Sequence, residues 1–323
     1  MKFPRSTPFH TSNVARRDIL KLLSLGGIVS ASGLAGCAGL AVQNATAPGT
    51  AGMGRAPVTP PRDFTFLQLS DTHWGYQGSD NPESIHTLRA AIHEINASSL
   101  KPDFVVFTGD LTHITPEVTL RRQRMKEFRE IIGELDVKTR YFLPGEHDVG
   151  PDSGEVYREN FGKGYGSFDH EGIHFVMLDN VSSGGMSLGD AQLDWLDSDL
   201  RRLDARVPVV VFAHRPLFAL FPSWDWMTQD GGRALELLQP HAHVTVFYGH
   251  IHQEHHFKTG HIEHHAARSL IFPLPAPGSV AAKAPLAWDP SSRDHGLGYR
   301  VLREIQRSPV IEERSLSIAT LNR

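Results

Sequence analysis

Cysteine is almost missing from this chain of 323 residues, in which Cys37 is the single thiol. One cysteine excludes a disulfide within the chain, a zinc ribbon and a Cys-His catalytic pair. The body of the chain has no block of basic residues, and a net charge of -4 does not indicate a nucleic-acid partner. A phosphate-binding glycine loop is also absent, which argues against P-loop enzymes.

Long apolar runs are scarce as well, and the one that stands out lies near the N-terminus. It extends from Ile19 to Val29, follows Arg16 and Arg17, and gives way to small residues up to Cys37. A basic start, an apolar middle and a small-residue end are the parts of a secretory signal. Residues 15–21 resemble a twin-arginine export signal, and an ordinary secretory signal is the alternative. Either signal predicts an exported protein that uses an export machinery, and later apolar runs are too short to span a bilayer.

The end of this segment predicts a lipid anchor. Leu34-Ala35-Gly36-Cys37 resembles a bacterial lipobox, in which the thiol is acylated and the cysteine becomes the new N-terminus. Each buried methylene of an acyl chain contributes about 0.8 kcal/mol to membrane binding. The alternative is that Cys37 falls inside a signal that is removed elsewhere.

Three regions follow from these patterns. Residues 1–37 are the expected signal with its lipobox, and residues 38–62 are a flexible linker rich in Ala, Gly, Pro and Thr. Residues 63–323 are expected to fold as one domain. That domain should be periplasmic or membrane-anchored, facing outside the cytoplasm, with the membrane as a partner through the lipid.

Short apolar runs alternate with amphipathic stretches from Phe64 onward. Runs rich in Val, Phe and Ile predict strands at residues 64–69, 104–107, 141–143, 173–178, 207–212 and 244–248. Apolar stripes at helical spacing predict three helices that pack in the core. The stripes are Ile85, Leu88, Ile92 and Ile95; Phe128, Ile131, Ile132 and Leu135; and Leu193, Leu196, Leu200 and Leu203. The third stripe follows a cap-like stretch at residues 187–190. The alternation indicates an α/β fold. Residues 272–290 predict a long loop, and residues 299–318 one or two late strands.

Polar residues that can bind metals follow five of the six predicted strands. They are Asp71-Thr72-His73, Gly109-Asp110, Gly145-Glu146-His147-Asp148, His214 and Gly249-His250-Ile251-His252. Ligands gather at the carboxyl ends of the strands in open α/β sheets. Each piece alone is weak, because a single His after a strand is more often structural than a ligand. All five motifs in this order are hard to explain as solvent-exposed polar residues without a function.

This ordered set resembles the motifs of the calcineurin-like metallophosphoesterases, over residues 64–252. The resemblance implies two mixed β-sheets sandwiched between α-helices, a four-layer α/β/β/α arrangement. It also implies metal-dependent hydrolysis of phosphoric esters, either monoesters or diesters, with a small-molecule phosphate ester as substrate. Residues 63–323 would then be the catalytic domain of an enzyme of the bacterial cell envelope.

The resemblance implies a metal centre of two ions bridged by Asp110. The ligands of the first ion would be Asp71, His73 and His252, and those of the second would include His214 and His250. This mix of oxygen and nitrogen ligands suits Mn, Fe or Zn, as two divalent or mixed-valence ions. Two such ions can activate water and hold the phosphoryl oxygens.

His147 and Asp148 are the expected catalytic pair by the same resemblance. His147 would stabilise or protonate the leaving oxygen, and Asp148 would orient its ring. The chain departs from the family at Glu146, where an Asn usually binds the second metal ion. If Glu146 is a ligand there, its charge predicts a preference for diesters. The departure also keeps open a non-catalytic or weakly active metal-binding protein on the same fold.

Other residues carry weaker expectations. Asn180 either reaches the site or serves a turn, and His113 either faces the substrate or lies in a solvated loop. Trp224 and Trp226 either line a cleft or cover the core. The histidine-rich stretch 255–265 is expected to form a loop or strand at the rim of the site rather than an accessory metal site.

The substitution Cys37→Ser is expected to release the protein into the soluble extracytoplasmic fraction, because the acylated thiol is lost. Cell fractionation followed by immunoblotting measures this, and Ser32→Ala in the same segment is the control. A wild-type protein that is already soluble after export would contradict the lipid anchor.

Overall fold

The computed structural model describes residues 62–150, 152–305 and 308–318. The strands are β1 Phe64–Leu69, β2 Phe104–Thr108, β3 Arg140–Leu143, β4 Gly166–His170, β5 Ile173–Leu178, β6 Val209–Ala213, β7 Val244–Tyr248, β8 His255–Thr259, β9 Ile262–Ala266, β10 Gly298–Ile305 and β11 Ser308–Ser315. The helices are α1 Ser84–Ala97, α2 Val118–Ile132, α3 Glu146–Val149, α4 Glu155–Phe161, α5 Asp190–Leu200 and α6 Gly231–Leu238, with a 3-10 turn at Pro222–Trp224.

The expected signal, Cys37 and almost all of the expected linker lie outside the described residues. Those assignments and the domain boundaries therefore stay predictions. Among the residues that are described, no helix combines the length and the apolar character needed to cross a membrane.

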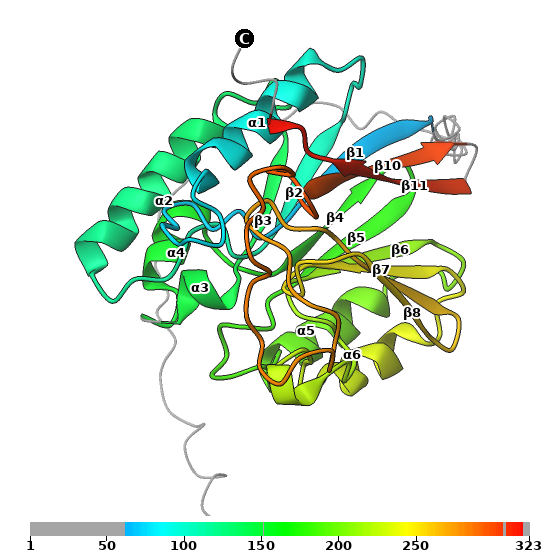
Figure 1. The fold of residues 1–323 in the computed structure, drawn as a ribbon. Coiled ribbons are helices and arrows are strands. Elements are labelled where there is room, and N and C mark those ends of the chain that lie inside the picture. The colour runs from blue at the N-terminus through cyan, green and yellow to red at the C-terminus, as the bar shows by residue number, and fades with distance from the viewer. Residues whose placement is uncertain (1–61, 151, 306–307, 319–323) are drawn as a thin grey trace, which may run out of the picture. The chain divides into compact units, whose positions relative to one another are not determined.

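The strands form two mixed sheets (Figure 1). The first sheet has the order β11-β10-β1-β2-β3 and the second β4-β5-β6-β7-β9-β8. Strands β1, β2 and β3 are parallel, as are β5, β6, β7 and β9, whereas β10, β11, β4 and β8 pair antiparallel with their neighbours. The predicted fold class is confirmed.

An aromatic core fills the space between the two sheets. The ring of Phe66 in the first sheet lies 5.6 Å from that of Phe175 and 6.0 Å from that of Phe212 in the second, both edge to face. Phe104 and Phe247 belong to the same buried cluster. A buried aromatic side chain removes about 150–250 Å² from water, so these rings hold the sheets against one another.

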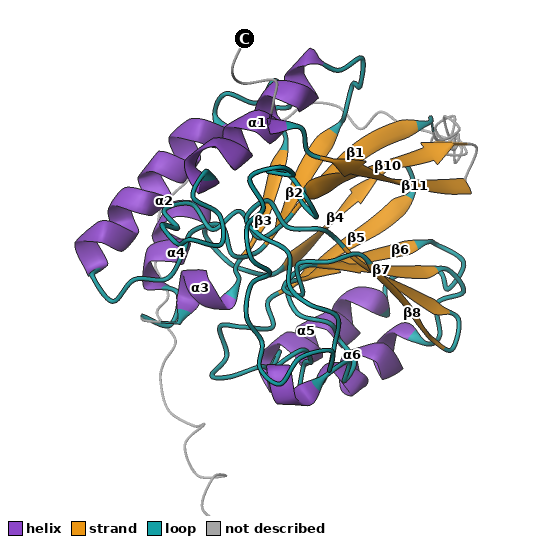
Figure 2. Ribbon diagram, in the orientation of Figure 1, coloured by secondary structure: helices purple, strands orange, loops and turns teal. Residues whose placement is uncertain are grey.

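Helices cover the outer face of each sheet (Figure 2). α1 and α2 pack on the first sheet through residues such as Ile92 and Phe128. α5 and α6 pack on the second sheet through Leu196 and Leu235. The result is the four-layer α/β/β/α arrangement that the family resemblance implies.

The six predicted strands are all present, with ends within two residues of those expected, and β10 and β11 are the late strands. The loop predicted over residues 272–290 is part of a longer stretch, 267–297, without a helix or named strand. Strand β4 is not predicted from the sequence, and β8 and β9 are expected only as a loop or strand at the rim of the site. All three contain many polar residues and lack a clear apolar run.

Two details of the predicted helices are wrong. Ile85 was expected in the buried stripe of α1, but 56% of it is exposed, because it lies in the first turn at the margin of that stripe. Residues 187–190 were expected to cap α5 through a side chain. The N-cap is Gly189, with no side-chain cap bond, and Asp230 instead accepts the N–H groups of Leu188 and Gly189 at 2.8 and 2.9 Å.

The parallel order brings the carboxyl ends of β1, β2, β3, β6 and β7 to one edge of the sheets. The long loop 267–297, orange in Figure 1, returns to this edge, where the N–H of Leu270 donates to the carbonyl of Ser70 at 3.1 Å. Segments far apart in the sequence therefore meet where the motif residues lie.

Two isoleucines of α1 provide a matched test of the packing. Ile92→Ala should lower the free energy of unfolding by about 2–5 kcal/mol, because Ile92 is buried against the first sheet. Ile85→Ala should change it by only about 0.5 kcal/mol. Urea unfolding followed by circular dichroism gives both values, and equal effects would contradict the packing of α1.

Candidate metal centre

The loops after β1 and β2 remain paired beyond the ends of their strands. The N–H groups of Asp71 and His73 donate to the carbonyls of Gly109 and Asp110 at 3.1 and 2.9 Å. The first two motifs are thereby held in a fixed register, so their side chains start from a rigid backbone.

Five of the predicted ligands adopt left-handed backbone angles, which residues other than glycine rarely adopt. The φ angles are 52° at Asp71, 41° at His73, 50° at Asp110, 65° at His250 and 53° at His252. Each such residue costs on the order of 1–3 kcal/mol, and such residues cluster at functional sites. The direction of these side chains is therefore maintained at the expense of local backbone stability.

Glycine is needed where the third and fifth motifs touch other motifs. A Cβ atom on Gly145 would overlap the backbone nitrogen and the carboxylate of Asp110, and one on Gly249 would overlap the hydroxyl of Ser70. These glycines allow the ligand-bearing loops to approach closely.

The first predicted ligand group is assembled in the structure. Asp71, His73 and His252 are buried, and each offers a ligand atom within 4.8 Å of the others. His252 Nε2 lies 3.4 Å from Asp71 Oδ1. His73 Nε2 is buried without a hydrogen-bond partner among the described residues, which suits a nitrogen whose lone pair binds a cation.

The second group contains Asp110, Glu146, His214 and His250, again with ligand atoms within 4.8 Å. Glu146 points into this group: its Oε2 lies 2.8 Å from His214 Nε2 and its Oε1 2.9 Å from His250 Nδ1. The carboxylate that departs from the family pattern thus occupies the position expected of a second-metal ligand.

Asp110 lies between the two groups. Its Oδ2 is 3.3 Å from His73 Nε2 in the first group and 3.6 Å from His214 Nε2 in the second. Burial lowers the pKa of His214, but Asp110 and Glu146 together raise it well above its usual value. A cation would supply the positive charge that this imidazolium otherwise brings, so metal binding is expected to release protons.

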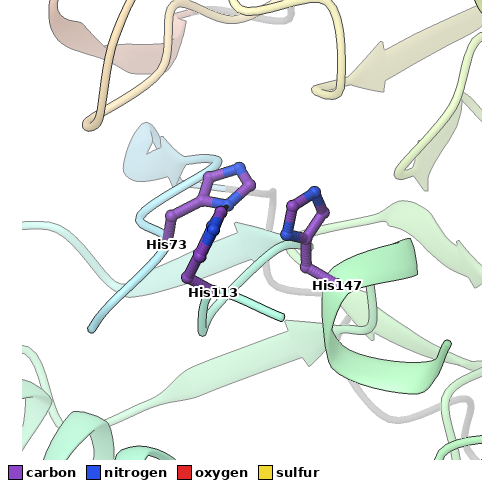
Figure 3. A group of neighbouring side chains, drawn as sticks. All are labelled: His73, His113 and His147. Carbon is purple, nitrogen blue, oxygen red and sulfur yellow. Dashed lines mark hydrogen bonds between the residues drawn. The ribbon is translucent and has the colours of Figure 1, made fainter. Parts of the chain in front are cut away.

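His147 lies beside the first group, where its ring centroid is 4.4 Å from that of His73 (Figure 3). Its Nδ1 accepts the N–H of Ile114 at 3.2 Å, so a neutral His147 carries its proton on Nε2. Its backbone N–H donates to Asp110 at 2.9 Å. The third motif is thereby tied to the predicted bridging carboxylate.

Asp148 does not orient the ring of His147, which corrects the expectation from the resemblance. Its carboxylate accepts the backbone N–H groups of Leu111, Thr112 and Gly145 at 2.9–3.0 Å. Burial first, and the nearby Asp110 carboxylate second, raise the pKa of Asp148 to about 7. Asp148 fixes the loops that carry Asp110 and His147, so it acts on the site through their backbone.

Arg215 and Asp225 belong to the site although the sequence does not single them out. Arg215, only 5% exposed, places Nη2 3.3 Å from Glu146 Oε2 and Nη1 3.2 Å from Asp225 Oδ2. Asp225 Oδ1 lies 3.6 Å from His250 Nε2 and 2.6 Å from Lys283 Nζ. The position of Arg215 directly after His214 is the one local signal that would have found it.

The weaker candidates have structural roles. Asn180 is buried and donates to the carbonyl of Arg215 at 2.9 Å, so it supports the loop after β6. Trp224 and Trp226 are buried in an apolar cluster and cover the core. Among the described residues, the stretch 255–265 contains no group of three ligands close enough for a metal ion, and it forms β8 and most of β9. His113, in contrast, lies against His73, as shown in Figure 3.

A sequence model of the calcineurin-like phosphoesterase family matches residues 64–254. This match covers more than half of the chain, so the chain belongs to that family. It is a phosphoesterase, a hydrolase that acts on phosphoric ester bonds, and its ligand groups are those of a metal-dependent enzyme.

Known proteins resemble the chain in sequence and in fold. It is 29% identical to the serine/threonine-protein phosphatase CPPED1 of Danio rerio over 59% of this chain and 70% of that protein. It is 25% identical to the 3',5'-cyclic-nucleotide phosphodiesterase alr5338 of Nostoc over 59% and 72%. The mammalian CPPED1 proteins are matched over about half of their length. A dimetal phosphatase structure from Danio rerio has the same fold, with a TM-score of 0.59 at 16% identity, covering 78% of this chain and 96% of that one.

Replacement of Glu146 tests its position in the second group. Glu146→Asn keeps an oxygen ligand but removes a charge, so the second metal ion should bind about tenfold more weakly, since ligand charge tunes affinity. Metal content after dialysis against a chelator measures this, with the exposed Glu130→Gln as control. Unchanged metal retention would mean that Glu146 does not bind the ion.

Proposed function

We propose that the chain hydrolyses phosphoric esters at a centre of two metal ions in the bacterial cell envelope. The observation that carries this proposal is the position of Asp110. One carboxylate oxygen lies near a histidine of each ligand group, at 3.3 and 3.6 Å. A carboxylate placed in this way suits two cations that share a ligand.

The chain provides ligands for both ions. Asp71, His73 and His252 would hold one, Glu146, His214 and His250 the other, and Asp110 both. Their oxygen and nitrogen atoms fit Mn, Fe or Zn. When bound, such ions supply an activated water and neutralise the charge that develops on the phosphoryl group.

His147 is the group best placed to serve the leaving oxygen. Because Ile114 N–H occupies Nδ1, the proton of a neutral His147 is on Nε2, free to be donated. Asp148 keeps the backbone around this residue in place through Gly145. The protein therefore contributes a positioned N–H and a rigid loop to the bond-breaking step.

The charge near the second group bears on the choice of substrate. Glu146 adds a negative charge where the family usually has an amide, which disfavours a dianionic monoester. Arg215 lies 3.3 Å from Glu146 and offsets part of that charge. The case for a preference for diesters is therefore weaker than Glu146 alone suggests, and both ester classes remain substrates to test.

The names of the relatives indicate which substrates should be tested. One relative is a serine/threonine-protein phosphatase and another a cyclic-nucleotide phosphodiesterase. A phosphoserine peptide, a cyclic nucleotide, and p-nitrophenyl phosphate beside bis-p-nitrophenyl phosphate cover these chemistries. The envelope location rests on residues 1–37, whose sequence resembles an export signal with a lipobox.

Metal removal should abolish hydrolysis of every ester in the panel, and added Mn²⁺ should restore it. Asp110→Asn should not regain activity, because the shared ligand loses its charge. His147→Ala should keep its metal content while turnover falls by about 10²- to 10⁴-fold. Steady-state kinetics joined to elemental analysis measures all three. Full activity of the metal-free wild type would overturn the proposal, and a metal-loaded wild type inactive on the whole panel would favour a non-catalytic metal-binding protein.

A further inference from the structure

His113 contacts a predicted metal ligand whose second ring nitrogen lacks the usual backbone partner. His214 and His252 each donate from Nδ1 to a backbone carbonyl oxygen at 2.8 Å. His73 Nδ1 instead lies 3.2 Å from His113 Nδ1, and the two rings are neighbours in Figure 3. A side chain thus takes the place that the backbone has at His214 and His252, as the Asp225 carboxylate does at His250.

The number of protons on the two rings fixes their roles. A neutral imidazole carries one proton, on either nitrogen. His73 Nε2 faces Asp110 Oδ2 at 3.3 Å, inside the first ligand group. A nitrogen that binds a cation must be unprotonated, so the proton of His73 is on Nδ1. His113 Nδ1 must then accept this hydrogen bond, and the proton of His113 is on Nε2.

We propose that His113 is a positioning residue for the first metal ion. Its Nδ1 accepts the N–H of His73 and so keeps the lone pair of His73 Nε2 directed at the cation. The inference rests on the proposed metal centre. Outer partners of ligating histidines fix the tautomer and the ring orientation, and their loss typically costs about 10- to 100-fold in metal affinity or activity.

The backbone holds His113 in place without help from its ring. Its N–H donates to the carbonyl of Trp74 at 3.0 Å, and Trp74 and Thr112 form a parallel bridge. Arg124 Nη1 donates to the carbonyl of His113 at 2.7 Å. The ring itself packs edge-on against Tyr76, with centroids 5.0 Å apart. A changed side chain at position 113 should therefore alter the contact with His73 more than the course of the loop.

A contact with the substrate is the competing role for His113, because its ring centroid lies 4.9 Å from that of His147. The two roles use different nitrogens. Nδ1 faces His73, whereas Nε2 carries the proton that a substrate oxygen would accept. Asparagine and glutamine separate the roles, since the amide of Asn reaches the position of Nδ1 and that of Gln the position of Nε2.

Three substitutions in the full chain test the proposal: His113→Leu, His113→Asn and His113→Gln. Their affinity for Mn²⁺ is measured by competition with a chelator in the absence of substrate. The Leu and Gln variants should bind one of the two ions about 10- to 100-fold more weakly, and the Asn variant close to wild type. His86→Leu, at an exposed histidine of α1, is the matched control and should leave both affinities unchanged.

Wild-type affinity for both ions in the Leu variant would overturn the proposal. If KM then rises in the Leu variant and recovers with Gln, His113 contacts the substrate instead. Should the Leu variant fail to fold by circular dichroism, the comparison of Asn with Gln still decides, because equal affinities would overturn the proposal. A wild type that binds no Mn²⁺ would overturn the metal centre itself, so the two failures can be told apart.

Discussion

Carboxylates of like charge are buried near one another at one edge of the two sheets, and that crowding governs the rest of the site. Asp71 and Asp110 are 0% and 1% exposed, and Glu146 adds a third carboxylate in the same ligand group as Asp110. A buried charge costs several kcal/mol unless it is paired. Histidines and Arg215 supply part of the opposite charge, and the proposed cations would supply the rest. Rigid loops are needed because these groups would otherwise separate into water.

Two features of the fold keep these loops rigid. Rings such as Phe66 and Phe175 hold the two sheets together, so loops from both sheets share one edge. The backbone pairing of β1 and β2 then continues into the loops that carry Asp71 and Asp110. Left-handed backbone angles at five predicted ligands add a local cost, which the buried core of the domain must offset.

Much of the fold and most of the site could be predicted because the relevant patterns are local. The strands β1, β2, β6 and β7 are rich in Phe, Val and Leu, and motif residues stand directly behind them. The tertiary structure brings the predicted ligands together in the predicted groups. Their functional roles stay predictions, apart from the ring-orienting role of Asp148, which the contacts contradict.

What the sequence could not provide depends on contacts between distant segments. Arg215 becomes relevant only because Glu146 lies beside it, and His113 only because the loops after β1 and β2 are paired. β8 has a polar sequence and is a strand because β9 pairs with it, which local propensity does not reveal.

Because of the long loop after β9, the folded domain extends beyond the residues that match the family model. The family match ends at residue 254, yet the carbonyl of Phe272 accepts the Nδ1–H of His252, and the N–H of Leu270 binds the carbonyl of Ser70. The last strands, β10 and β11, then return to pair beside β1. The recognisable motif is therefore not an interchangeable module. A recombination that exchanged residues 64–254 alone between relatives would transfer the ligands but leave behind the chain that orients one of them.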